Sequence, residues 1–283
     1  MNDRSPLDDA GTLDYRERHD SFERWFQTPL GRALLADQRR FCDLELGEMA
    51  GARQLQVGVS HRLPLATGTD FAQRIITTPR WFSHMPDGVV VCDSDELPLP
   101  SDAMDLVILH HSADFSVSPH QVLREAARVL RGEGTILLLG FNPVSLWGAR
   151  RLISRAHEGP WGGRFLSRGR MEDWLRLLGF AVEGSVTRFL RLPLQRSGRR
   201  PDRRLDVRLS DSRLMPLGAY YGILAKKRVY GRLPRRPVWR PSKVIALPGT
   251  GSVGLSRQLQ TTHRTTNDPD LGSTNARKRH PVH

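Results

Sequence analysis

The chain has 283 residues, of which 39% are apolar and two are cysteine. Its net charge is +13, and most of this excess lies in residues 191–240, which contain fifteen Lys and Arg against three Asp. One globular domain with appended segments suits this length, and two cysteines exclude a disulfide framework or a zinc cluster, so no metal site is expected. With no signal-peptide core at the start and no apolar run of roughly 18 residues, we expect a cytoplasmic protein without a membrane partner.

The first segments differ in composition. Residues 1–14 are acidic and polar, and we expect them to be flexible. Apolar side chains then recur at helical spacing over residues 15–40. This spacing predicts a helix with one buried face.

Five short apolar segments follow, each bounded by turn residues, which is typical of strands covered on both faces of a parallel sheet. They are residues 54–60, 74–78, 89–92, 104–109 and 135–140. The sequence between the first two is short for a crossover helix. Before the last segment, Ser118, Pro119 and an apolar stripe predict a helix that ends at Gly132. This order of elements predicts the doubly wound α/β class.

The later elements complete one domain. Ser167 begins a predicted helix that Gly179 closes, and the segment FAVEGSV predicts a strand after it. Residues 215–227 predict a final strand. Beyond residue 231 the sequence has few large apolar side chains and cannot offset the entropy of ordering. We therefore expect one domain over residues 15–231 and a basic disordered tail over 232–283.

Two motifs identify a family resemblance. D-S-D-E-L-P-L-P-S-D-A-M-D-L-V at residues 93–107 is followed by L-R-E-A-A-R-V-L-R-G-E-G-T-I-L-L-L at 123–139. This spaced series resembles the methyltransferase type 11 group of S-adenosylmethionine-dependent methyltransferases, and a proteobacterial subgroup in which the glycine loop is degenerate. The resemblance implies a doubly wound, mostly parallel sheet with an antiparallel last strand, and S-adenosyl-L-methionine as the cofactor. It also implies that the first helix lies over the cofactor side, although a helix that only covers the sheet fits the residues as well.

The family binds its cofactor on a Gly-x-Gly-x-Gly loop after the first strand, where missing side chains let the backbone approach the ligand. Here Gly58 remains and Val59 follows it, but Ser60 and Arg62 replace the later glycines, and Gln56 stands where the family has an acid. We expect Gly58, Val59 and Ser60 to contact the cofactor. The Arg62 side chain can turn to solvent, pair with the cofactor's carboxylate or fill the pocket.

The acids expected beyond this loop are only partly present. No acid ends the second strand, where Thr77 and Thr78 each offer one weaker hydrogen bond to a ribose. Asp93 follows the third strand directly and matches the family's acid for the adenine amino group, with Ser94 in the same turn. We therefore expect Asp93 and Ser94 to bind the cofactor, although a solvent-facing turn would carry the same residues.

His110 and His111 follow the fourth strand. Because neighbouring side chains on extended backbone point to opposite sides, at most one of them faces the pocket, where it could act as a general base. We place His110 among the cofactor-binding residues and His111 among the acceptor-binding candidates, with structural roles open for both. Phe141, Asn142 and Trp147 are further acceptor candidates, unless they only start and pack a helix. Methyl transfer mainly needs alignment of donor and acceptor, so no catalytic residue is assigned.

The resemblance implies a methyltransferase whose acceptor is unknown. An alternative from another class is a cofactor-free binding protein with the same fold, in which the basic residues 191–240 bind nucleic acid phosphates. A dinucleotide oxidoreductase is disfavoured, because the loop after the first predicted strand lacks the G-x-G-x-x-G pattern and the acid about twenty residues beyond it.

Overall fold

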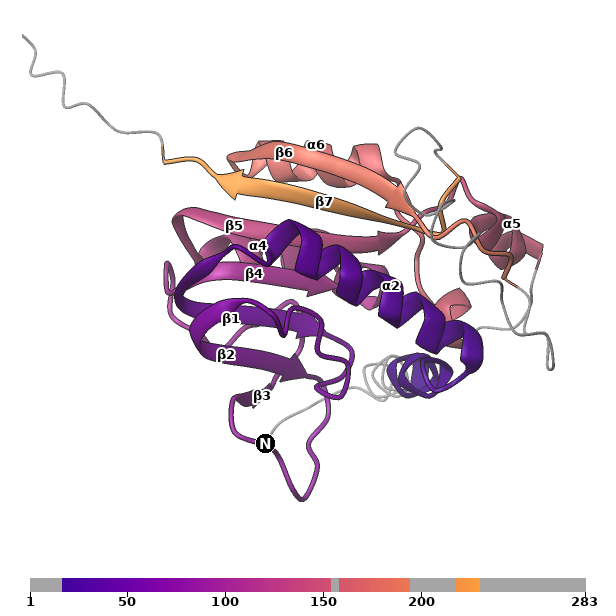
Figure 1. Cartoon of the computed structure of the whole chain (residues 1–283), viewed down its shortest axis with the longest axis horizontal. Helices are drawn as coiled ribbons and strands as arrows, with labels where there is room; N and C mark the ends of the chain where they lie inside the picture. The colour runs from indigo at the N-terminus through magenta and orange to yellow at the C-terminus, as the bar shows by residue number, and fades with distance from the viewer. Residues whose placement is uncertain (1–16, 154–157, 194–216, 230–283) are drawn as a thin grey trace, which may run out of the picture. The chain divides into compact units, whose positions relative to one another are not determined.

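The computed structural model describes residues 17–153, 158–193 and 217–229. These residues form a seven-stranded sheet in the order β3-β2-β1-β4-β5-β7-β6 (Figure 1). The strands are β1 (Ala50–Gly58), β2 (Asp70–Thr78), β3 (Val89–Val91), β4 (Met104–His110), β5 (Leu130–Phe141), β6 (Phe180–Arg188) and β7 (Tyr220–Lys227). The helices are residues 17–25, α2 (Pro29–Leu46), α3 (Ser112–Phe115), α4 (Pro119–Val129), α5 (Leu146–Ile153) and α6 (Arg168–Leu177), with a 3-10 turn at Gly159–Gly162. The predicted flexible start, residues 1–14, and the predicted tail, residues 232–283, lie outside the described residues.

The strand directions confirm the predicted fold class. β1, β2, β3, β4 and β5 are parallel to their neighbours, whereas β7 is antiparallel to both β5 and β6. After β1 the chain moves outward to β2 and β3, and it then returns to place β4 on the other side of β1. The carboxyl ends of β1 and β4 therefore form the topological switch point, where doubly wound sheets bind their ligands.

Helices cover both faces of the sheet, and the strands alternate their side chains between the two. Helix 17–25, α2 and the segment after β1 cover one face, into which Leu106 and Ile108 of β4 project. α4 and α6 cover the other face, into which Val107 and Leu109 of β4 project. Figure 1 shows α2 crossing the strands on the near side. Burial on both faces explains why the strands are nearly continuous apolar runs. Within the described ranges, no helix is long and apolar enough to cross a membrane.

The connection from β1 to β2 contains no helix, as its short length predicts. Two buried glutamines of β1 bind it instead. Gln56 donates from Nε2 to the carbonyl of Leu63 at 2.8 Å and accepts from the amide of Leu65 at 2.9 Å. Gln54 donates to the carbonyl of Ala66 at 3.2 Å. The glutamine that replaces the expected acid thus satisfies loop backbone groups that would otherwise be buried without partners.

The structure corrects the helix predicted over residues 15–40. The helix breaks between residues 25 and 29, because Pro29 lacks the amide hydrogen that an uninterrupted helix needs. Thr28 caps the new helix by accepting a hydrogen bond from the amide of Gly31 at 3.1 Å. Two helices with different directions replace the single predicted one.

The predicted end of α4 at Gly132 was also wrong. The helix ends at Val129 and β5 begins at Leu130, because Leu130 pairs with Met104 and extends the strand backwards past the glycine. Ser118 does occupy the position before α4, but its side chain makes no capping hydrogen bond. The cap predicted at Ser167 is confirmed by its bond to the amide of Arg170.

Candidate functional site

The crevice at the switch point is filled by aromatic side chains from helix 17–25 and from the turn after it. At the carboxyl ends of β1 and β4, Gly58 pairs with His110. The ring of Phe26 lies 5.7 Å from that of His110, and the ring of Phe22 lies 5.6 Å from that of His111. Both phenylalanines are fully buried. The helix therefore occupies the place at which a doubly wound fold receives its ligand.

Gln38 of α2 joins the two histidines in a buried hydrogen-bond network. Its Oε1 lies 3.1 Å from His110 Nε2, and its Nε2 lies 2.7 Å from His111 Nε2. An amide nitrogen can only donate, so Nε2 of His111 accepts and its proton is on Nδ1. That Nδ1 lies 2.8 Å from Oδ2 of Asp114, which also accepts from the amide of Phe141 at 2.9 Å.

The two histidines lie on the same side of the sheet, so the prediction that they point to opposite sides was wrong. The rule of alternation holds only along extended backbone. β4 ends at His110, and His111 has φ 55 and ψ 10 in the left-handed region. This turn directs both rings toward Gln38. A non-glycine residue in this conformation is strained unless its surroundings hold it there, as the network does.

Burial sets the protonation of this network. It lowers the pKa of His111 to about 3 and lowers the pKa of His110 well below its usual range. Burial also raises the pKa of Asp114, against the smaller lowering effects of the Phe141 amide and of Arg151. Both histidines are therefore neutral near pH 7. In this conformation the two histidines bind the end of β4 to α2. The Nε2 atom of His111, which is the atom that could accept a proton, is covered by Gln38.

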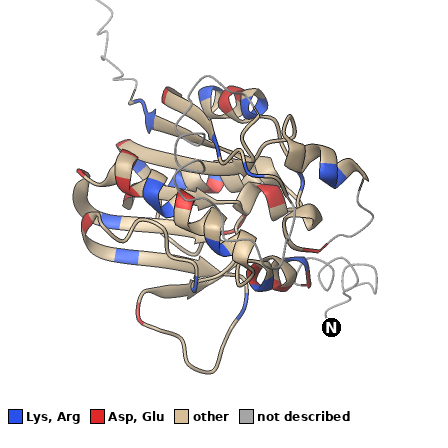
Figure 2. Ribbon diagram, turned by 45° about the vertical axis from the view of Figure 1, so that its right-hand side comes forward, with Lys and Arg blue, Asp and Glu red and all other residues tan. Residues whose placement is uncertain are grey.

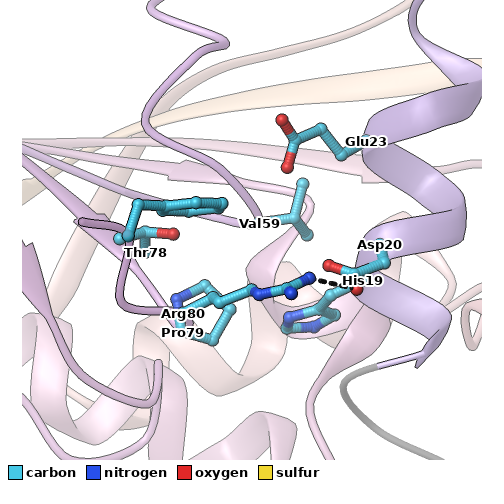
Figure 3. Close-up of a pocket in the computed structure, with 8 residues that line it drawn as sticks. His19, Asp20, Glu23, Val59, Thr78, Pro79 and Arg80 are labelled. Atoms are coloured by element: carbon cyan, nitrogen blue, oxygen red, sulfur yellow. Dashed lines mark hydrogen bonds and ion pairs between the residues drawn. The ribbon is translucent and has the colours of Figure 1, made fainter. Parts of the chain in front are cut away.

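A small hollow remains beside the aromatic side chains (Figure 3). Its lining comes from helix 17–25, from the residue after β1 and from the end of β2 with the loop after it, and comprises His19, Asp20, Glu23, Val59, Thr78, Pro79, Arg80 and Phe82. The hollow has room for about one water molecule. Arg80 crosses it to bind Asp20 at 2.6 Å, as the dashed line in Figure 3 marks.

Arg62 lies at the rim of this hollow and does not fill it. Its side chain is 58% exposed and its guanidinium lies 3.4 Å from Glu23. The same group lies 4.8 Å from the centre of the Phe82 ring. The bulky residue in the glycine loop therefore turns outward and joins the loop to helix 17–25. The Ser60 hydroxyl stays inside the turn, where it accepts from the Arg62 amide at 3.1 Å.

The turn after β3 presents polar groups at the same edge of the sheet. Asp93 is exposed there, and the amide of Cys92 donates to the carbonyl of Thr78 at 3.0 Å, which ties this turn to the end of β2. The buried Ser94 Oγ and His110 Nδ1 have no hydrogen-bond partner within the described part of the chain. Buried polar atoms without partners are rare in folded proteins, so these two atoms are candidates to bind a polar ligand.

Three predicted acceptor residues are buried in the same aromatic cluster. The Phe141 ring stacks on His111 at 3.9 Å, and Trp147 lies edge-on to Trp25 of the first helix at 5.7 Å. Asn142 donates from Nδ2 to the carbonyl of Gly218 at 2.9 Å. In this conformation all three pack the protein interior. For Phe141 and Trp147, the predicted contact with an acceptor therefore requires helix 17–25 to move.

Sequence reasoning did not find three groups that the structure adds to the site. Gln38 and the acids of helix 17–25 lie far along the chain from the residues that they contact, and no local pattern marks them. Asp114 carried a weak signal, because it lies three residues after His111 and can reach it across one turn. A carboxylate at that spacing is too common to be assigned from sequence alone.

Part of the site lies within a segment that matches a known family. Residues 46–138 match the family model for a methyltransferase domain, which is about a third of the chain and spans β1 to the carboxyl half of β5. Over these residues the chain is similar to that family. A curated relative, an uncharacterized protein named YafS from Escherichia coli, is 34% identical over 140 residues. That similarity covers 49% of this chain and 55% of the relative, so the chain spans about half the length of the protein that it matches.

Solved structures share the fold at low sequence identity. A protein from Thermotoga maritima described as an S-adenosylmethionine-dependent methyltransferase, possibly a histamine N-methyltransferase, aligns with TM-score 0.54 and 19% identity over 76% of this chain and 99% of its own. A putative methyltransferase solved with the Haloferax volcanii activator Trm112 aligns with TM-score 0.53 and 13% identity over 75% and 98%. These similarities establish the Rossmann-like methyltransferase fold.

Proposed function

We propose that this chain is an S-adenosylmethionine-dependent methyltransferase that acts on an acceptor not yet identified. The observation that carries the proposal is the family match over residues 46–138, which contain β1 to β4, most of β5 and the switch point. The cofactor supplies an activated methyl group with its own leaving group, so the protein mainly aligns the reactants.

The polar groups at the carboxyl edge support this proposal. Asp93 would accept the adenine amino group, and the Ser94 hydroxyl and His110 Nδ1 are buried atoms that need partners. Gly58 ends β1 without a side chain, and Val59 follows it and lines the hollow. Ser60 uses its hydroxyl within the turn, so it would offer the ligand only backbone contacts.

The available space does not suit the cofactor until helix 17–25 moves. The hollow holds about one water molecule, and three of its lining residues come from this helix. Two exposed ion pairs, Arg80 with Asp20 and Arg62 with Glu23, join the helix to the loops after β2 and β1. Exposed pairs contribute only about 0–1 kcal/mol each, so the aromatic contacts beneath the helix hold it more strongly.

Titration calorimetry with S-adenosylmethionine tests the proposal. We expect the full chain to bind the cofactor, and Asp93→Ala to weaken binding at least tenfold, since a hydrogen bond to a charged group contributes about 1.5–3 kcal/mol. Asp173→Ala, which removes an exposed aspartate of α6, is the matched control and should bind as the unchanged chain does. No binding at millimolar cofactor, with the fold intact, would contradict the proposal.

A cofactor-free binding protein is the second candidate, and the filled crevice favours it. In this alternative the basic residues 191–240 bind nucleic acid, with affinity that falls steeply as salt rises. Only residues 191–193 and 217–229 of this segment are described. In this alternative, charge reversal at Arg199, Arg200, Arg203 and Arg204 would abolish nucleic acid binding, and the unchanged chain would not bind S-adenosylmethionine. A cytoplasmic location remains part of the proposed function.

A further inference from the structure

A cluster of exposed apolar side chains surrounds α5 at the carboxyl edge of the sheet. It contains six of the twelve large apolar side chains that are exposed in the described residues: Val144, Leu146, Leu152, Ile153, Leu192 and Leu217. We call this cluster the α5 patch. Single exposed apolar residues are ordinary, but contiguous groups of them mark sites of interaction.

Hydrogen bonds hold the three segments of the α5 patch together. The Asn142 side chain, two residues before Val144, binds the carbonyl of Gly218, which follows Leu217. Trp147 donates from Nε1 to the carbonyl of Arg191 at 2.7 Å, beside Leu192. The three segments of the patch therefore lie together where the chain leaves β5 and β6 and enters β7, and Figure 1 shows α5 at the tips of these strands.

α5 exposes its apolar side chains more than its two arginines, which are half-buried, and this is the reverse of an ordinary surface helix. Leu152 and Ile153 are 82% and 83% exposed. The guanidinium of Arg150 instead lies 4.1 Å from the centre of the Trp161 ring. Arg151 donates from Nε to the carbonyl of Gly163 at 2.7 Å. Burial of a leucine or isoleucine side chain is favourable by about 1.5–3 kcal/mol. A partner that covers this face would therefore bind with a favourable contribution from each of these side chains.

The charge around the α5 patch is positive. Residues 142–153 and 189–193 contain Arg150, Arg151 and Arg191 and no Asp or Glu. This is a local property, because the described residues together carry 23 Lys and Arg against 21 Asp and Glu, and Figure 2 shows both signs spread over the ribbon. A partner of negative charge is complementary to this region.

We propose that the α5 patch docks on an anionic lipid surface. Its aliphatic side chains would enter the boundary of the acyl chains while the arginines contact headgroup phosphates, as in helices that lie in the plane of a membrane interface. A second copy of the chain would bring like charges together, and nucleic acid would leave the aliphatic side chains exposed. We expected no membrane partner because the sequence lacks an apolar run long enough to cross a membrane. A helix that lies in the membrane interface does not need such a run. This inference is independent of the proposed methyl transfer.

Vesicle co-sedimentation of the full chain tests this surface. The probes are vesicles of phosphatidylcholine with one third phosphatidylglycerol, and vesicles of phosphatidylcholine alone. The variant Leu152→Ser with Ile153→Ser removes the two most exposed apolar side chains of α5. The matched control is Leu44→Ser with Leu177→Ser, two leucines that are 69% and 84% exposed. Each control site closely precedes a strand that runs parallel to β5, so both lie at the opposite, amino edge of the sheet.

We expect the chain to bind the anionic vesicles and to bind phosphatidylcholine alone at least about tenfold more weakly. The α5 variant should lose binding at least tenfold, and the control variant should bind as the unchanged chain does. Circular dichroism confirms that both variants fold. No binding to anionic vesicles overturns the proposal. The proposal is also overturned if the α5 variant still binds these vesicles. It is overturned as well if a single-stranded oligonucleotide abolishes vesicle binding equally in both variants, because charge alone then explains the binding.

Discussion

Phe22 is the side chain through which helix 17–25 most firmly closes the crevice, so Phe22→Ala is a sharp test of the need for that helix to move. Its fully buried ring contacts those of Phe26, Phe115, His111 and Phe141. Truncation of a buried phenylalanine to alanine typically costs about 3–5 kcal/mol. In the proposed mechanism, much of this cost falls on the closed state alone, because the open helix has already lost these contacts.

The expected result is a less stable protein that binds the cofactor more tightly. When only the open state binds, the apparent dissociation constant rises as the open fraction falls. A loss of about 3 kcal/mol from the closed state can therefore tighten binding up to roughly 100-fold. Titration calorimetry measures the affinity, and urea unfolding measures the free energy of unfolding.

Phe71→Ala is the matched control for this test. Phe71 is buried in the same apolar core, but its backbone pairs with Gly51 near the amino end of β1, away from the crevice. It should lower stability without tightening binding. The reasoning is refuted if Phe22→Ala folds cooperatively and binds the cofactor no more tightly than the unchanged chain, or if both variants tighten binding equally.

Two further predictions concern stability. Lys227 donates to Asp102 and to the carbonyls of Ala127 and Leu130 at the end of α4, so Lys227→Met should lower the free energy of unfolding by about 1–3 kcal/mol. Lys226→Met breaks one exposed ion pair and should change the free energy of unfolding by less than about 1 kcal/mol. Equal urea midpoints for the two variants would contradict this prediction. His111 stays neutral in the fold down to about pH 3 but takes up a proton below pH 6.5 when unfolded, so stability should fall as pH falls through this window, by at most about 5 kcal/mol from this residue. His110 acts in the same direction, whereas the raised pKa of Asp114 acts in the opposite one, since its stabilising contribution is present at low pH and is lost as pH rises. Urea midpoints measured across the window should depend less on pH in His111→Asn, and an equal dependence in both proteins would sink the assignment.

Much of the sheet was predictable because the signals for it are local. The runs that became β1 to β5 are apolar over a few residues and are bounded by turns, and the pattern of parallel burial needs no knowledge of distant partners. The stop at Gly179 was also predictable, since its φ of +86 is a conformation that glycine adopts without strain. The turn that carries Asp93 was found for the same reason, because it directly follows such a run.

Other features depended on contacts between distant residues. The sequence identified Gln56 as a departure from the expected acid, but only the folded chain shows it bound to the Leu63–Leu65 backbone. The orientation of His111 follows from a single backbone angle, and its contact with Gln38 joins residues 73 apart. Neither can be read from periodicity.

The amino-acid sequence by itself determined the strands, their parallel class and the acidic turn after β3, since each depends on side chains within a few positions of one another. Only the tertiary structure decided that helix 17–25 fills the crevice, that Arg62 turns outward, and that the apolar side chains around α5 gather on one exposed surface. These outcomes depend on how separate elements pack, and packing brings together residues whose separation in the chain carries no local signal.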